Sequence, residues 1–186
     1  MAAPARRRAT YEDLLRVPEN LVAEIIDGEL ITHPRPSPRH ARASSMLGSE
    51  VTTPFDKGSG GPGGWWILDE PEIHLDEDIV VPDLAGWRRD KLPKLPDNAY
   101  FEQVPDWICE VLSPATYKTD RSRKMPLYAR HGVTHLWLVD PDARTLEVYR
   151  LQESHWLLLH TFRDDETVIA EPFESVPLEL GVLWVD

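Results

Sequence analysis

The chain has 186 residues, of which 41% are hydrophobic and 28% charged, and its formal net charge is −12 at pH 7. These values predict one globular domain with a sizeable core, and no apolar run is long enough to span a membrane. The acidic charge argues against a protein that binds nucleic acid independently of sequence through a basic surface. It does not exclude an enzyme whose acids bind a metal ion, because the ion reverses the local field.

The start of the chain and its cysteine content bear on where the protein works. Residues 1–9 contain three consecutive arginines and are predicted to be a disordered basic tail, and residues 10–186 a single domain. No apolar segment follows the arginines, so we expect no secretory signal. The single cysteine, Cys109, lies in an apolar stretch, which is typical of a reduced, buried thiol. We therefore expect a cytoplasmic protein.

The first predicted elements are a short helix and a β-hairpin. A threonine cap followed by two acids predicts a helix over residues 11–15. Alternating apolar residues predict a strand over residues 21–26, and the Asp27-Gly28 pair favours a hairpin turn. Residues 29–33 then form the returning strand.

Two polar residues lie on the inner faces of the early elements. Glu24 shares its strand face with apolar neighbours, so it is either an edge residue that reaches water or a second acid aimed at a functional site. The Ser37-Pro38 pair predicts the start of a helix that continues to about Val51. His40 lies in the first turn of this helix. It is either a structural histidine whose hydrogen bonds are made at the helix start or a group that faces the functional site.

The middle of the chain is predicted to contain two strands and two loops. Residues 57–64 are rich in glycine but lack the Gly-Lys-Ser/Thr ending of a phosphate-binding loop, so that function is rejected. Strands are expected over residues 65–75 and 78–87, and Pro82 should bend or bulge the second because proline cannot donate to a ladder. Residues 88–103 are charged and contain prolines, which indicates a surface loop, either a flap over a site or part of a subunit contact.

The later elements begin with a buried strand over residues 106–112, which carries Glu110 in its interior. A basic helix is expected to begin at Asp120 or Ser122 and to end at Gly132. The remaining expected elements are a buried strand over residues 135–140, a hairpin over 145–151 and 154–162, and short strands or turns over 168–184.

Glu110 needs a partner, because a buried carboxylate is costly without a cation or hydrogen-bond donors. Asp106 lies on the same strand with its Cα about 13 Å away, so one metal ion cannot easily join the two. Asp83 lies on a separate strand, and because neighbouring strands are roughly 4.8 Å apart, Asp83 and Glu110 can share an ion. Lys124, at the start of the next helix, can lean back over the same strand end.

Two acids on adjacent strands beside a lysine suit metal-assisted cleavage of a phosphodiester. Carboxylate oxygens bind a hard divalent ion such as Mg²⁺, and the ion lowers the pKa of a bound water and neutralises charge on the phosphate. The lysine orients the water or stabilises the pentavalent transition state. The alternative is that Asp83 is a strand-end acid and that Lys124 is a surface cation paired with Glu110.

Several pieces of sequence between Tyr11 and Leu151 resemble one known family, and their combination is specific although no single piece is. On these residues the chain resembles the Uma-two family of restriction endonuclease-like proteins, in the PD-(D/E)XK nuclease superfamily. The pieces are Glu24-Ile-Ile-Asp-Gly-Glu-Leu30, Ser37-Pro-Arg-His40, Val81-Pro-Asp-Leu84, Pro105-Asp-Trp-Ile-Cys-Glu-Val-Leu-Ser-Pro114, Asp120 with Lys124 and Tyr128, and Gly132-Val-Thr-His-Leu-Trp-Leu-Val-Asp140.

The resemblance implies an α/β (α+β) fold, with a restriction-endonuclease-like mixed β-sheet core flanked by helices and an N-terminal β-hairpin. It implies that Asp83 and Glu110 are metal ligands, with the backbone carbonyl of Val111 as a third. The superfamily pattern places a lysine two residues after the second acid, where this chain has Leu112. The family is thought to use a lysine displaced to the next helix, which maps onto Lys124.

The resemblance also bears on other residues of the candidate site. Glu24 and His40 match family positions and join the predicted catalytic residues. Lys118 is a rival to Lys124 but matches the pattern less well. Pro126 departs from the expected helix former, and it could move the helix start to Ser122 and displace Lys124.

These observations lead to three hypotheses. The first is a Mg²⁺- or Mn²⁺-dependent endonuclease with nucleic acid, in the first instance DNA, as substrate; water attacks phosphorus in line and the 3′ oxygen leaves. The second is a catalytically inactive nuclease-fold protein with an interaction or structural role, which the net charge, Leu112 and Pro126 favour. The third is a hydrolase of small phosphate esters, which a narrow, closed pocket would favour.

A homodimer is expected as well, because an enzyme that cuts both strands of a duplex needs two sites. The Trp65-Trp66 pair and residues 88–103 are the candidate contacts.

Overall fold

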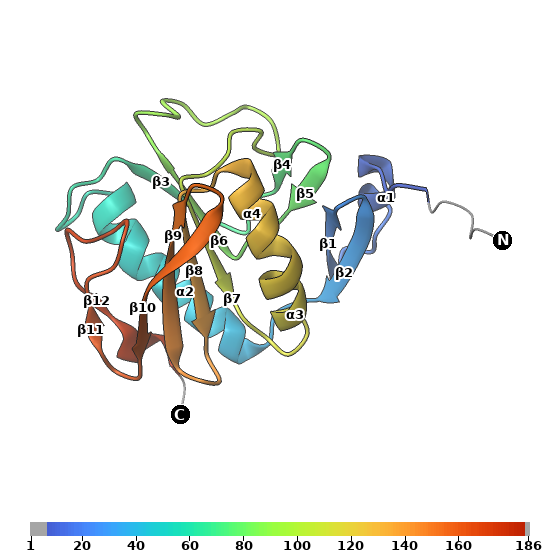
Figure 1. Ribbon diagram of the computed structural model, residues 1–186. Coiled ribbons are helices and arrows are strands. Elements are labelled where there is room, and N and C mark those ends of the chain that lie inside the picture. Colours follow the sequence, from blue (N-terminus) through green and yellow to red (C-terminus); the bar gives the residue numbers. More distant parts are fainter. Residues whose placement is uncertain (1–6, 185–186) are drawn as a thin grey trace.

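A six-stranded sheet forms the centre of the structure, a computed structural model that describes residues 7–184 (Figure 1). Its strands lie in the order β10-β9-β8-β7-β6-β3, and all neighbours are antiparallel except the parallel pair β7 and β8. The sheet is therefore mixed, as expected. The strands are β3 (Trp65–Asp69), β6 (Leu84–Arg88), β7 (Trp107–Val111), β8 (His135–Asp140), β9 (Thr145–Gln152) and β10 (His155–Arg163).

A smaller four-stranded sheet lies beside the central sheet, with its strands in the order β2-β1-β5-β4. It contains the predicted N-terminal hairpin, which is confirmed with its return strand extended to Pro34. A third sheet has two strands near the C-terminus. The elements are α1 (Tyr11–Leu15), β1 (Leu21–Ile26), β2 (Glu29–Pro34), β4 (Ile73–Leu75), β5 (Asp78–Val80), β11 (Thr167–Val168) and β12 (Leu178–Glu179), followed by a 3₁₀ turn over Leu180–Leu183.

Helices cover both faces of the central sheet (Figure 1). On one face lies α2 (Pro38–Val51), which begins as predicted, with the Ser37 side chain accepting a hydrogen bond from the backbone N–H of His40 at 3.3 Å. A π turn over Thr52–Asp56 continues it. On the other face lies one helical run, made of α3 (Tyr117–Thr119), a π turn over Asp120–Lys124, and α4 (Met125–His131).

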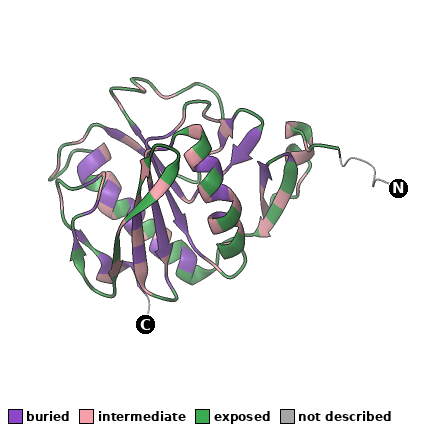
Figure 2. Ribbon diagram, viewed as in Figure 1, coloured by how far each residue is buried: buried purple, intermediate pink, exposed green. Residues whose placement is uncertain are grey.

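The two faces of the sheet have separate apolar cores, and strand β7 contributes to both. Trp107 and Cys109 pack with side chains of α2, whereas Ile108 and Leu112 pack with side chains of α4. Figure 2 shows the central strands as buried between the two layers of helices. Because side chains alternate along a strand, Glu110 points to the α4 side, where the helical run covers it.

Two predicted strands are each divided between the two sheets. The strand expected over residues 65–75 is β3 in the central sheet and β4 in the smaller one, and the strand expected over 78–87 is β5 and β6. The break at Pro82 is thus larger than the predicted bend, because the chain leaves one sheet there and enters the other. A proline has no N–H to continue the ladder, so it suits this crossing point.

The helical run begins earlier than predicted. It starts at Tyr117, whose backbone N–H donates to the carbonyl of Ser113 at 2.8 Å, and not after Asp120 or Ser122. It ends as predicted at Gly132, which has a φ of 81° that glycine adopts without strain.

Part of the predicted N-terminal tail makes contacts with the domain. Residues 1–6 lie outside the described residues. Arg7 pairs with Asp13 at 2.8 Å, and the Ala9 N–H donates to the carbonyl of Gly28 at 2.8 Å, so the frayed tail does not extend to residue 9. Within residues 7–184, no helix combines the length and the apolar character needed to cross a membrane.

Candidate active site

Strands β6 and β7 bring Asp83 and Glu110 opposite each other. The antiparallel register pairs Leu84 with Cys109, so Asp83, one residue before Leu84, lies across from Glu110. The Oδ2 atom of Asp83 accepts a hydrogen bond from the backbone N–H of Val111 at 2.7 Å. The predicted proximity of the two acids on neighbouring strands is confirmed.

Lys124 reaches the same place from the π turn that covers β7. Its Nζ atom lies 2.8 Å from Oε1 of Glu110, 3.0 Å from Oε1 of Glu24 and 3.8 Å from Oδ1 of Asp120. The side chain is buried, with 2% of the residue exposed. Burial alone would lower the pKa of Lys124, but the charges of Glu110 and Glu24 outweigh it and raise that pKa well above its ordinary value. Lys124 therefore carries a positive charge at neutral pH.

Glu24 comes from β1 in the other sheet and holds Lys124 in position. Its Oε1 atom also accepts a hydrogen bond from the backbone N–H of Val81 at 2.9 Å, and its Oε2 atom lies 3.2 Å from Nε2 of His33. Burial would raise the pKa of Glu24, but Lys124, His33 and the Val81 N–H together lower that pKa to about 2. Both oxygens of Glu24 thus have protein partners, and the acid belongs to the site, not to an edge exposed to water.

Tyr128 is a second partner of Glu110. Its hydroxyl donates to Oε1 of Glu110 at 2.5 Å, and both residues are buried. Burial is the largest cause that raises the pKa of Glu110 well above its usual range; the charge of Lys124 opposes it. The sequence matched Tyr128 to the family without giving it a role. Its position four residues after Lys124, on the same helix face, was the available signal.

His40 lies beside the other acid. Its Nε2 atom is 3.3 Å from Oδ1 of Asp83, and its Nδ1 atom is buried without a hydrogen-bond partner among residues 7–184. Burial would lower the pKa of His40, but the adjacent Asp83 carboxylate outweighs this effect and raises it. The structure thus brings Asp83, Glu110, Lys124, Glu24 and His40 into one site.

Pro126 does not displace Lys124. The proline stands in the first turn of α4, directly after the π turn that carries Lys124, and the helical run passes through it without a break. The missing backbone donor is tolerated because the run changes its hydrogen-bond register at this point. The concern that Pro126 moves the helix start to Ser122 is wrong.

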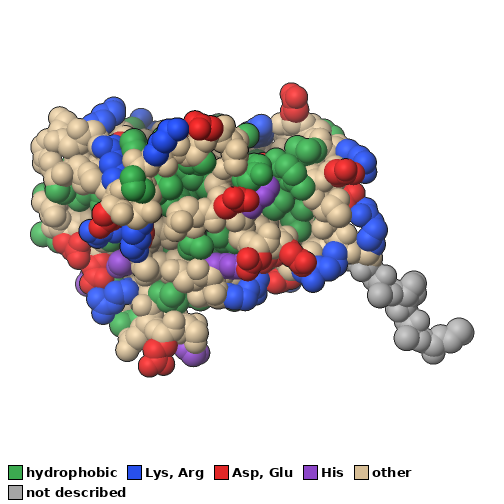
Figure 3. Space-filling view, turned by 90° about the horizontal axis from the view of Figure 1, so that it is seen from above, with side chains coloured by type: hydrophobic (Ala, Val, Ile, Leu, Met, Phe, Trp, Pro, Cys, Tyr) green, Lys and Arg blue, Asp and Glu red, His purple; other side chains and the backbone are tan. Residues whose placement is uncertain are grey.

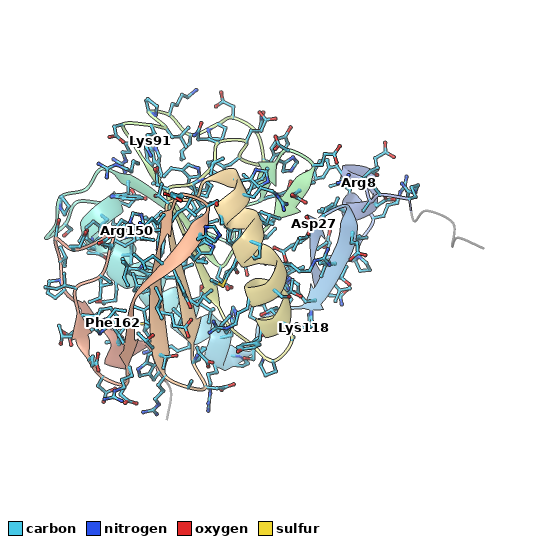
Figure 4. The ribbon with its side chains drawn as sticks, in the orientation of Figure 1. Arg8, Asp27, Lys91, Lys118, Arg150 and Phe162 are labelled. Atoms are coloured by element: carbon cyan, nitrogen blue, oxygen red, sulfur yellow. The ribbon has the colours of Figure 1, made fainter. Side chains whose placement is uncertain are left out.

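Lys118, Asp106 and the Trp65-Trp66 pair lie outside the site. Lys118 is exposed and lies at the N-terminal end of the helical run, as Figure 4 shows. Asp106 interacts at the opposite end of β7 with Lys91 and with the backbone N–H of Arg88. The Trp65-Trp66 pair is used within the chain, since Trp65 is 6% exposed and Arg89 stacks over Trp66 with its guanidinium carbon 3.9 Å from the ring centre. The homodimer itself stays a prediction.

The acids lie in a pocket of about 290 Å³ between the β2–α2 connection and the β7–α3 connection. Arg35 and Lys124 are the cations among the residues that line it, against four carboxylates. The lining acids are Glu70, Asp83, Glu110 and Asp120.

The residues present fit a hard divalent ion. The contacts of Glu110 with Tyr128 and with Lys124 both use Oε1. No three acidic, histidine or cysteine side chains in residues 7–184 form a ready-made cage. Mg²⁺ is typically held by one or two carboxylates together with water, and the carboxylates of Asp83 and Glu110 both line the pocket.

The mixed sheet between two helical layers, with an acid at the start of β6, an acid in β7 and a buried lysine beside them, defines a protein of the restriction-endonuclease-like fold. A family model described as Uma2, "Putative restriction endonuclease", matches residues 8–182, and the chain belongs to this family. A solved structure from Anabaena variabilis, described as a putative nuclease belonging to DUF820, is similar to this chain with a TM-score of 0.73 and 26% sequence identity. The match covers 94% of this chain and 97% of that one. A search of curated proteins found no match.

Proposed function

We propose that the protein is a metal-dependent endonuclease that hydrolyses phosphodiester bonds in DNA. In this proposal Asp83 and Glu110 hold Mg²⁺ or Mn²⁺, with the Val111 carbonyl as a third ligand. The observation that carries the proposal is the buried ammonium of Lys124, 2.8 Å from Glu110 in the pocket that Asp83 also lines. The family description and the description of the Anabaena structure, which both refer to nucleases, support it.

The excess of negative charge in the pocket favours a bound cation. Glu24, Glu110 and Asp120 lie within 3.8 Å of the Lys124 ammonium, and Asp83 lines the same pocket. When bound, a divalent ion neutralises charge on the phosphate and supplies a water with a lowered pKa. The negative charges attract such an ion, and they repel a phosphate that arrives when no metal ion is bound.

The remaining residues have distinct roles in this proposal. Lys124 is charged and therefore acts as a donor to a phosphate oxygen, not as a general base. Glu24 is a positioning residue, because its contacts hold the ammonium in place. His40 and the Val111 N–H fix the orientation of Asp83. Tyr128 fixes Oε1 of Glu110 through its hydrogen bond.

The lysine contact weakens one argument for a catalytically inactive protein. That alternative drew support from Leu112 at the usual lysine position and from Pro126 in the helix. Lys124 nonetheless reaches Glu110 from the helical run.

The test is metal binding and cleavage by wild type and by conservative variants. We expect wild type to bind Mn²⁺ in calorimetry and to cut a labelled oligonucleotide only with Mg²⁺ or Mn²⁺ present. Asp83→Asn and Glu110→Gln should lose both properties, whereas Asp97→Asn, an exposed acid in the 88–103 loop, should keep them. Wild type that binds no divalent ion, or Asp83→Asn that binds as tightly as wild type, would refute the proposal.

Lysine variants give a matched pair on the same helical run. Lys124→Met should abolish cleavage, and Lys118→Met, which alters an exposed lysine outside the pocket, should not. Equal loss in both variants would contradict the role assigned to Lys124.

A further inference from the structure

The reactive groups lie deep in the pocket. Glu110 and Lys124 are 3% and 2% exposed, and the pocket above them holds about 290 Å³. That volume is at the lower end of pockets that accept one small molecule, about 300–1,000 Å³. The major groove of B-DNA is by itself about 12 Å wide, so a duplex would have to stay outside the pocket, above Glu110 and Lys124. Only a segment of one strand fits between the two walls.

Part of the rim of the pocket is apolar. One wall is the connection from β2 to α2, which presents Pro34 and Pro36; the other is the start of the connection from β7 to α3, which presents Pro114 and Ala115. These residues are exposed, and a proline has a fixed φ and no N–H to donate to a phosphate. Apolar surfaces of this kind pack against the face of a base that has left its stack.

The lining of the pocket contains two cations, Arg35 and Lys124. Proteins that hold a duplex neutralise several phosphates on both sides of the cut with Lys and Arg. Here Lys124 is buried among acids, and Arg35 is engaged with Glu70 at 3.9 Å and with the carbonyl of Glu19 at 2.9 Å. Figure 3 views the molecule from above the orientation of Figure 1, and on that face both acidic and basic side chains are exposed.

We infer that the site takes its phosphodiester from an unpaired DNA strand and not from a continuous duplex. This inference rests on the proposed endonuclease function and adds the substrate class. One nucleotide enters between the two proline-bearing walls, with its base against Pro36 and Pro114. Its phosphate then reaches the level of Glu110 and Lys124.

Cleavage of matched oligonucleotides tests the inference. One labelled strand is offered to wild type with Mg²⁺ as a single strand, in a perfect duplex, and in a duplex with a central unpaired bubble. We expect the single strand to be cut at least ten-fold faster than the duplex, and cuts in the bubble substrate to lie in the unpaired segment. A duplex cut as fast as the single strand overturns the inference and leaves the endonuclease function standing. Absence of cleavage in all three substrates overturns both the single-strand inference and the endonuclease function. This holds even if the protein hydrolyses a small aryl phosphodiester, because that activity is not cleavage of DNA.

A rim variant separates base packing from a general effect on the fold. Pro36→Ser should raise KM for the single strand about three- to ten-fold with little change in kcat, because the exposed proline touches the base and not the reacting phosphate. Pro93→Ser alters an exposed proline in the 88–103 loop, outside the pocket, and should leave both constants unchanged. An unchanged KM in Pro36→Ser, at wild-type thermal stability, contradicts the assignment of the rim.

Discussion

Replacing Lys124 by methionine tests whether the buried ammonium is the charge on which the site depends. The substitution keeps an unbranched side chain of similar length and removes the positive charge. Glu24 and Glu110, which are 1% and 3% exposed, then lose the cation that lies 3.0 and 2.8 Å from their oxygens. Removing one partner of a buried ion pair costs about 3–5 kcal/mol. For a chain of this size that is a decrease in Tm of about 6–20 °C.

The pH dependence of this loss has a defined sign. Without Lys124, burial raises the pKa of both carboxyls in the folded state above their unfolded values, so the variant gains relative stability when the pH falls and protons bind. The difference in Tm between wild type and Lys124→Met should therefore be largest near pH 7.5 and smaller at pH 5. Circular dichroism melts at the two pH values measure it.

Lys118→Met is the control for this experiment, because it removes an exposed lysine from the same helical run. Its free energy of unfolding should lie within about 0.5 kcal/mol of wild type. A Tm for Lys124→Met within about 2 °C of wild type at pH 7.5 would refute the reasoning, since two buried carboxylates cannot lose the ammonium between them at so small a cost.

Three further predictions concern the neighbours of Lys124. Because the pKa of Glu24 is about 2 in the folded state against 4.5 ordinarily, wild type should lose about 3 kcal/mol as the pH falls from 4.5 towards 2, and urea unfolding of Glu24→Gln should lack that part of the loss. An identical acid profile in the variant would contradict the assignment. Tyr128→Phe removes the donor to Glu110 and should cost about 1–3 kcal/mol in urea unfolding, whereas Tyr117→Phe, at an exposed tyrosine, should cost almost nothing. Cys109 is fully buried, and burial raises the pKa of its thiol well above 9, so an aromatic disulfide reagent should modify it only after unfolding. Rapid modification of the folded protein would show that β7 is more accessible than the structure indicates.

Local sequence signals were sufficient for many elements. The Asp27-Gly28 turn, the Ser37-Pro38 helix start and the Gly132 stop depend on backbone preferences within a few residues, and the structure has all three where expected. The exclusion of Asp106 as the partner of Glu110 also needed only the rise of a strand. That acid interacts with Lys91 at the other end of β7.

Sheet membership was not visible from local pattern. Residues 65–75 and 78–87 each look like one strand because apolar residues continue through them, yet each is divided between two sheets. The division depends on which strands pair across long sequence distances. A proline such as Pro82 permits the crossing, but only the packing of the whole domain requires it.

The site shows the same limit. The sequence by itself determined which residue types could form it, namely two acids on strands, a lysine on the following helix, and Glu24 and His40 from the resemblance. The tertiary structure decided that Glu24 in β1 and Glu110 in β7 share one ammonium, and that Tyr128 holds the same oxygen of Glu110. The physical reason is that these contacts join residues up to a hundred positions apart. Their geometry is set by the register of β6 against β7 and by the π turn, which places Lys124 against Glu110 of β7.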